Sequence, residues 1–120
     1  MDGITCGSLI CYDIRFPEWI RVYALRGIET LFICSQWTRG RMDLYRTMIR
    51  AHAIENMFYT VAVNNCDYSG DIDFGGESFV SSPTGEVLVS CSGTRDGKFV
   101  AVDVTNINEN RQFLKVFEKR

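Results

Sequence analysis

Short apolar runs alternate with amphipathic stretches in the first half of the chain, which predicts strands joined by helices. Residues 4–11 form an apolar run that ends in polar and turn-forming residues. Pro17 then opens a helical pattern over residues 17–26, and Gly27 is a typical C-terminal stop. Residues 28–34 contain a second apolar run that does not alternate, as expected for a parallel strand covered on both faces.

Residues 41–58 have the longest helical pattern in the chain. One stripe of side chains falls at helical spacing and is predicted to be buried: Leu44, Met48, Ala51, Glu55 and Phe58. This stripe takes Glu55 into the core, where a carboxylate needs a partner. We expect that partner to be Arg50 or an arginine from another element.

Residues 59–64 supply a third apolar run, so the first half reads as a parallel β-α-β-α-β unit. After a polar, glycine-bearing loop at 68–76, three short strands are predicted: residues 77–82, 87–90 and 99–104. The Pro83-Thr-Gly85 turn separates the first two of these strands, which makes them antiparallel. The predicted fold class is therefore α/β, with parallel strands first and antiparallel strands after.

Composition argues against several classes of protein but does not by itself identify one. With 120 residues the chain is one domain's worth, and we assign residues 1–120 to a single domain. A net charge of -2 with both signs interspersed argues against nucleic acid or an anionic membrane as partner. No apolar run approaches the length of a membrane span, so we expect a cytoplasmic protein.

The chain has five cysteines and one histidine, with no C-x-x-C pair. We expect reduced thiols, no disulfide framework and no metal site. Cys11 differs from the other four in its place, at the carboxyl end of the first predicted strand. Ligands of open α/β sheets bind at that edge, and backbone N–H groups of the following turn lie close by. This is a suitable position for a thiolate nucleophile.

Four segments, taken in order, resemble the carbon–nitrogen hydrolase (nitrilase/amidase) superfamily. They read GSLICYDIRFPE at 7–18, LFICSQW at 31–37, RAHAIEN at 50–56 followed by YTVAVN at 59–64, and GESFVSSPTG at 76–85. The resemblance implies the C-terminal part of a four-layer α-β-β-α sandwich. The YDIRFP continuation is most similar to the branch that includes ω-amidases, which hydrolyse small monoamides of dicarboxylic acids.

The same resemblance implies a role for several residues. Cys11 matches the nucleophile that attacks an amide carbon and forms a thioester, and the backbone N–H of Tyr12 matches an oxyanion donor. Trp37 and Arg39 match the loop that binds the substrate. The small amide is the expected partner, and no cofactor is implied.

Two further residues, Asp13 and Glu55, are expected to be structural residues near this site. The glutamate base and the lysine of the family precede the nucleophile strand, and neither lies in this chain. Loss of a general base costs about 10²–10⁴-fold in rate, so the chain alone is expected to be nearly inactive. His52, Glu18 and Lys98 are better read as structural or solvated residues than as replacements.

An incomplete domain of this type would leave an apolar sheet face and strand edges exposed. We therefore expect a homo-oligomer or pairing with an N-terminal segment. The leading function is amidase-type hydrolysis through Cys11. The alternative is a non-catalytic remnant or interaction module that keeps half of the fold.

Overall fold

The computed structural model describes residues 3–91, 95–115 and 117–118. Five strands form one sheet in the order β1-β2-β3-β6-β7. Their bounds are Cys6–Ile10, Thr30–Ser35, Tyr59–Asn64, Phe79–Ser81 and Val87–Ser90. The first three strands pair in parallel, and β6 and β7 continue the sheet antiparallel. This confirms the predicted α/β order of parallel strands followed by antiparallel ones.

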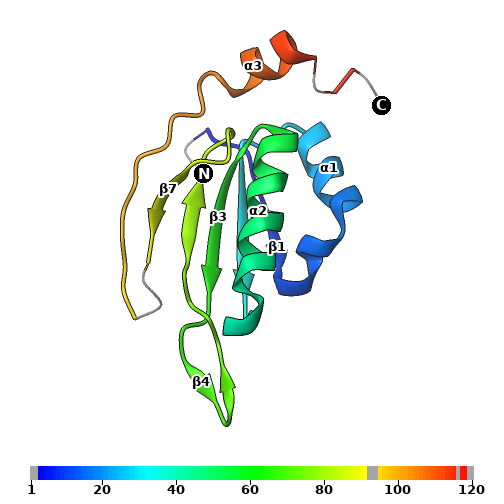
Figure 1. Ribbon diagram of the computed structural model, residues 1–120. Helices are drawn as coiled ribbons and strands as arrows, with labels where there is room; N and C mark the ends of the chain where they lie inside the picture. The colour runs from blue at the N-terminus through cyan, green and yellow to red at the C-terminus, as the bar shows by residue number, and fades with distance from the viewer. Residues whose placement is uncertain (1–2, 92–94, 116, 119–120) are drawn as a thin grey trace.

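Two helices cover the same face of this sheet, as Figure 1 shows: α1 (Pro17–Leu25) and α2 (Met42–Asn56). Pro17 occupies the first turn of α1, and Gly27 adopts φ 85° just beyond its end, as the sequence predicted. A third helix, α3 (Ile107–Leu114), lies toward the C-terminus. Within the described ranges, no helix combines the length and apolar character needed to cross a membrane.

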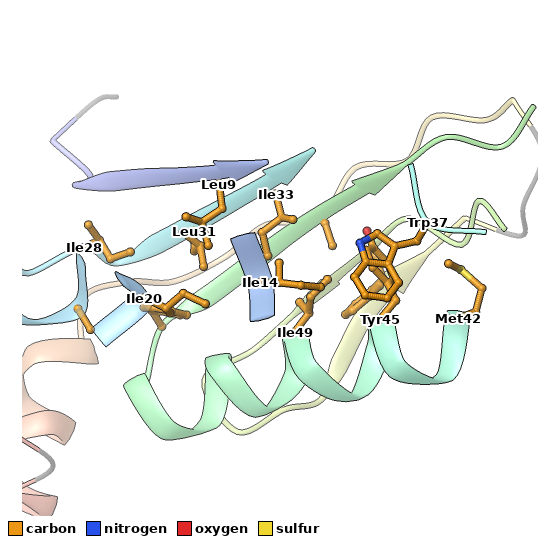
Figure 2. Packing of buried hydrophobic residues seen from close by; sticks show 14 residues of the cluster. Leu9, Ile14, Ile20, Ile28, Leu31, Ile33, Trp37, Met42, Tyr45 and Ile49 are labelled. Atoms are coloured by element: carbon orange, nitrogen blue, oxygen red, sulfur yellow. The ribbon is translucent and has the colours of Figure 1, made fainter. Parts of the chain in front are cut away.

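The core lies between the sheet and the helices α1 and α2 (Figure 2). Leu31 and Ile33 of β2 point into it, and α2 contributes Tyr45 and Ile49, all four fully shielded from solvent. Tyr45 meets Phe79 of β6 edge-on, with the ring centroids 6.0 Å apart. This packing extends from β1 to β6 and holds the carboxyl ends of the parallel strands in place.

The other face of the sheet is open, and this corrects the prediction that the 28–34 strand is covered on both faces. Neighbouring strands place Ile10, Cys34 and Val63 in register on that side. Ile10 is 71% exposed and Val63 is 52% exposed. We call this surface the open face, and the side that packs on α1 and α2 the covered face.

The buried stripe of α2 also differs from the prediction. The buried residues are Met42, Tyr45, Ile49, His52, Ala53 and Asn56. Leu44 is half exposed, and Ala51 and Glu55 face solvent. Of the other predicted members, Phe58 is buried as expected and Met48 is partly buried against the core. Both stripes have helical spacing, and the sheet selects the one with Tyr45 because that ring fills the space beside Phe79.

Two expectations for the second half were wrong. The segment predicted as a loop at 68–76 contains a small hairpin, β4 (Tyr68–Ser69) and β5 (Ile72–Asp73). Residues 99–104 do not form a strand, and the Phe99 side chain is fully exposed. This segment instead leads to α3, where Arg111 donates hydrogen bonds to the carbonyl oxygens of Asn56 and Ile28 at 3.2 and 2.7 Å.

Candidate active site

Cys11 opens a tight turn at the carboxyl end of β1. The turn is a 3₁₀ helix, η1 (Cys11–Arg15), and Cys11 adopts φ 50°, in the left-handed region that costs a non-glycine residue about 1–2 kcal/mol. The Asp13 carboxylate accepts a hydrogen bond of 3.1 Å from the Ile10 N–H, which ties the turn to the strand. The thiol is partly buried and packs against the core. Strained backbone of this kind is typical of functional sites.

The Cys11 thiol lines a pocket of about 220 Å³ at this edge of the sheet. The segment after β1 contributes Tyr12 and Arg15 to the lining, and the segment after β2 contributes Trp37 and Arg41. The segment after β1 therefore faces the segment after β2, as the parallel pairing of the two strands requires. The pocket is large enough for a small organic molecule beside the thiol.

Positive charge dominates the pocket. The Arg15 guanidinium lies over the rings of Tyr12 and Trp37, 5.5 and 5.2 Å from their centroids. Arg41 lines the same pocket. Among the described residues, no carboxylate forms an ion pair with either arginine. The two guanidinium groups can therefore bind an anionic group of a ligand.

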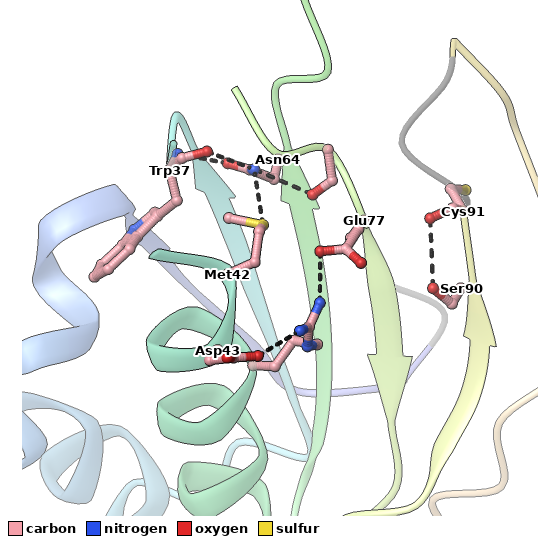
Figure 3. A network of polar contacts seen from close by, with 9 residues as sticks. Trp37, Met42, Asp43, Asn64, Glu77, Ser90 and Cys91 are labelled. Carbon is pink, nitrogen blue, oxygen red and sulfur yellow. Dashed lines mark hydrogen bonds and ion pairs between the residues drawn. The ribbon is translucent and has the colours of Figure 1, made fainter. Parts of the chain in front are cut away.

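Trp37 is held by a buried amide at the end of β3 (Figure 3). The Asn64 Oδ1 atom accepts a hydrogen bond of 2.7 Å from the Trp37 N–H, and Asn64 Nδ2 donates to the Trp37 carbonyl at 3.0 Å. The same Nδ2 donates to the Gly76 carbonyl at 3.1 Å. One side chain thus fixes the backbone of the pocket wall against the loop that precedes β6.

Tyr45 packs beside Trp37, with the ring centroids 5.9 Å apart, and cannot serve as a base near neutral pH. Burial raises the pKa of its phenol to about 12, the hydrogen bond from Ser35 lowers it, and negative charge on Cys11 or Cys34 raises it. The Ser35 Oγ atom lies 3.2 Å from the phenol oxygen. Tyr45 is therefore a protonated core residue.

The predicted substrate-binding residue Arg39 lies beside the pocket, outside its lining. Its guanidinium pairs with the Asp73 carboxylate of the β4–β5 hairpin at 2.6 Å. This hydrogen bond raises the pKa of Arg39, and the Asp73 charge adds to the effect. Trp37, in contrast, lines the pocket, with its side chain almost wholly buried.

Glu55 is not the buried ion-pair partner of an arginine that the sequence suggested. Its side chain is 43% exposed, and its Oε1 atom lies 2.8 Å from Nδ1 of the buried His52. Arg50 instead donates to the Gly85 carbonyl at 2.7 Å. The stripe that buries Tyr45 also buries His52, three residues before Glu55, so the carboxylate is left at the surface.

The three residues considered as catalytic replacements have other contacts or positions. His52 Nε2 lies 2.7 Å from the Ile14 carbonyl oxygen, so this ring atom is occupied by the backbone. Glu18 is exposed in the first turn of α1, where a carboxylate complements the helix dipole. Lys98 donates to the Ser90 carbonyl.

Sequence reasoning missed Arg15, Arg41 and Asn64 as parts of this site. Arg15 ends the Cys11 turn, and Arg41 follows the loop after β2. Asn64 is the last residue of β3. All three lie near carboxyl ends of neighbouring parallel strands, and that shared position was the available signal.

All five cysteines are free thiols. In the described part of the chain, no group of three or more His, Cys, Asp or Glu side chains is arranged to hold a metal ion. The chemistry that the geometry itself offers is that of a thiol beside two guanidinium groups.

Comparison with known proteins places this site in context. The family model described as "Carbon-nitrogen hydrolase" matches residues 1–111. The 2-oxoglutaramate amidase of Bacillus subtilis is 38% identical over 98% of the chain and 46% of its own length. The NitFhit protein of Caenorhabditis elegans superposes with a TM-score of 0.88 at 33% identity, over 96% of the chain and 28% of that protein.

A mutant of the amidase from Nesterenkonia sp. AN1 has a TM-score of 0.72 at 28% identity, over 77% of the chain and 35% of its own. That structure shows covalent addition of the acetamide moiety of fluoroacetamide at the active-site cysteine. The chain spans about half the length of the curated relatives it matches.

Proposed function

This chain belongs to the carbon–nitrogen hydrolase family, and from that membership we propose that it hydrolyses a small amide with Cys11 as the nucleophile. The observation that carries the proposal is the place of Cys11, in a left-handed turn at the carboxyl edge of the sheet and in the lining of a pocket. The covalent acetamide adduct at the cysteine of the Nesterenkonia amidase supports a cysteine as the reacting residue.

The proposed reaction has two stages. The Cys11 thiolate forms a C–S bond with the amide carbon, and the C–N bond then breaks, with the nitrogen leaving as ammonia or an amine after it gains a proton. Water attacks the thioester, which releases the acid and returns the thiol. The backbone N–H of Tyr12 is proposed to donate to the oxyanion, a contact that in other enzymes is worth about 10²–10³-fold in rate.

The substrate is proposed to carry a carboxylate in addition to its amide. Arg15 and Arg41 line the Cys11 pocket without a carboxylate partner among the described residues. A monoamide of a small dicarboxylic acid would place its carboxylate on these cations and its amide at the thiol. The similarity to a 2-oxoglutaramate amidase supports this substrate class. Trp37 would form the wall of the site.

The base and the cation of the family site are proposed to come from the rest of the protein. A thiol is mostly protonated at neutral pH and needs a base or a nearby cation to react. His52 is bonded to the Ile14 carbonyl, and Glu18 is exposed on α1. Because the relatives are about twice as long as this chain, we assign the glutamate and the lysine to their additional sequence.

The open face is proposed to pack on the same additional sequence, which would complete the four-layer sandwich. Ile10 and Val63 present apolar surface there that soluble proteins normally cover. We expect the 120-residue chain alone to self-associate and to bind a hydrophobic dye. A strictly monomeric chain that binds no dye in analytical ultracentrifugation and fluorescence experiments would contradict this.

Ammonia release from monoamides of small dicarboxylic acids tests the function in the whole protein. We expect Cys11→Ala to reduce hydrolysis to background, and Cys6→Ala to leave it near the wild-type rate because Cys6 lies at the other end of β1. A wild-type acyl-enzyme should appear by mass spectrometry as an adduct on the peptide that contains Cys11. Full activity of Cys11→Ala would overturn the proposal.

The alternative, a non-catalytic interaction module, rests on the absence of a free base beside Cys11 among the described residues. Alkylation by iodoacetamide at neutral pH separates the two functions. An activated Cys11 should react faster than Cys6, Cys34, Cys66 and Cys91. Equal rates for all five thiols in the whole protein would favour the non-catalytic module.

A further inference from the structure

The single histidine of the chain joins α2 to the turn that carries Cys11. His52 Nε2 lies 2.7 Å from the Ile14 carbonyl oxygen, across 38 residues of sequence, and the ring is buried. We infer that His52 is a positioning residue, which holds the Cys11 turn in its reactive conformation through the backbone. The inference rests on the proposed role of Cys11 as nucleophile.

The direction of the hydrogen bond follows from the chemistry of its two atoms. A backbone carbonyl only accepts, so Nε2 carries the hydrogen and donates to Ile14. The other ring nitrogen, Nδ1, lies 2.8 Å from the Glu55 carboxylate. Glu55 thereby fixes the orientation of the ring, as a carboxylate commonly does for a functional histidine.

The Cys11 turn needs such support because its backbone is strained. Cys11 adopts φ 50°, and a non-glycine residue keeps this conformation only where the surroundings hold it. At the start of the turn, the Asp13 carboxylate accepts from the Ile10 N–H. At its other end, His52 holds the carbonyl of Ile14, whose side chain is buried. The Cys11 thiol and the Tyr12 N–H lie between these two restraints.

The contacts of His52 distinguish positioning from direct catalysis. Nε2 is engaged by Ile14 and Nδ1 by Glu55, so both ring nitrogens are occupied away from the thiol. The backbone carbonyl of His52 in turn accepts from Asn56 Nδ2 at 3.0 Å. Its effect on Cys11 therefore passes through the turn.

A pair of isosteric variants separates the two bonds of the ring. The amide nitrogen of Gln at position 52 reaches about as far as Nε2, whereas that of Asn reaches only about as far as Nδ1. His52→Gln should therefore keep the donor to Ile14, and His52→Asn should lose it. His52→Ala removes both contacts.

Amide hydrogen exchange in the whole protein measures the restraint directly. We expect residues 11–15 to exchange at least about tenfold faster in His52→Asn and His52→Ala, the equivalent of one lost hydrogen bond. His52→Gln should stay within about threefold of wild type. Unchanged exchange at 11–15 in the Asn and Ala variants would overturn the inference. An equal increase in the exchange rates of residues 11–15 and of β3 would also overturn the inference, because it would show that the variants destabilise the whole fold.

Kinetics and NMR provide two further readouts. We expect His52→Asn to lower kcat about tenfold, because the Cys11 turn is no longer held in its reactive conformation, and His52→Gln to stay near the wild-type kcat. In the wild type, the Nε2 proton of His52, assigned by its loss in His52→Gln, should be protected from exchange. An Nε2 atom without a proton would overturn the inference. A wild type that releases no ammonia would refute the proposed function and leave the exchange and NMR tests intact.

Discussion

The two faces of the sheet are built from alternate residues of the same strands, yet they differ sharply in burial. On the covered face, Leu31 and Ile33 are fully buried beneath α2 (Figure 2). On the open face, Ile10 and Val63 remain largely exposed although they are equally apolar. The comparison shows that α1 and α2 bury one side of the sheet, while the other side keeps apolar side chains such as Ile10 and Val63 exposed.

Cys11 lies where the two faces meet. It lines the pocket with Arg15 and Trp37, and it also lines a second hollow with Ile10 and Cys34 beside the open face. Any segment that covers the open face would therefore approach the thiol from that side. Under the proposed function, such a segment would bring the base to Cys11 from the open face.

The largest effect on stability is expected from removing a buried side chain of the covered face. Ile33→Ala should lower the free energy of unfolding of this chain by about 2–5 kcal/mol, because a buried side chain is lost and a cavity remains. Val63→Ala, on the open face, should cost less than about 1 kcal/mol. Denaturant titration measures both values. Equal losses would show that the open face is as well packed as the covered one.

A smaller effect is expected at Asn64, the polar residue of the covered face beside Val63. Asn64→Ala should cost about 1–3 kcal/mol, because the Trp37 N–H loses its buried acceptor and the Trp37 and Gly76 carbonyls lose a donor. Asn64→Asp keeps the acceptor for Trp37 and is the matched variant. Denaturant titration would contradict the role of the amide if Asn64→Ala were as mild as Val63→Ala.

The smallest effect concerns pH and Tyr45. Its folded pKa, about 12, lies above that of an unfolded tyrosine near 10. The resulting stability is therefore present below pH 10 and is lost as pH rises toward 12. Between pH 9 and pH 11 this amounts to about 1 kcal/mol.

Two matched variants test this prediction, Tyr45→Phe and Tyr68→Phe. In Tyr45→Phe, the free energy of unfolding should lose this part of its pH dependence. Tyr68 is 71% exposed in the β4–β5 hairpin, so its variant should follow the wild-type curve. The measurement is denaturant unfolding at each pH. Identical curves for Tyr45→Phe and the wild type would refute the proposed contribution of the buried phenol.

The sequence determined those features that depend on neighbouring residues. Pro17 at the start of α1, Gly27 beyond its end and the apolar runs of β1, β2 and β3 each depend on local geometry or periodicity. The Pro83-Thr-Gly85 turn also formed as predicted, with Gly85 at φ 82°. Short parallel crossovers then placed Cys11 and the Trp37 loop at one edge, because the carboxyl ends of parallel strands meet there.

Only the tertiary structure decided which of two stripes α2 would bury, since both have helical spacing and the fit of Tyr45 against Phe79 chooses between them. The same choice buried His52 against Ile14 and left Glu55 at the surface. The tertiary structure also left residues 99–104 without a strand partner. These outcomes depend on contacts between segments far apart in the chain, and neither local propensity nor periodicity specifies such contacts.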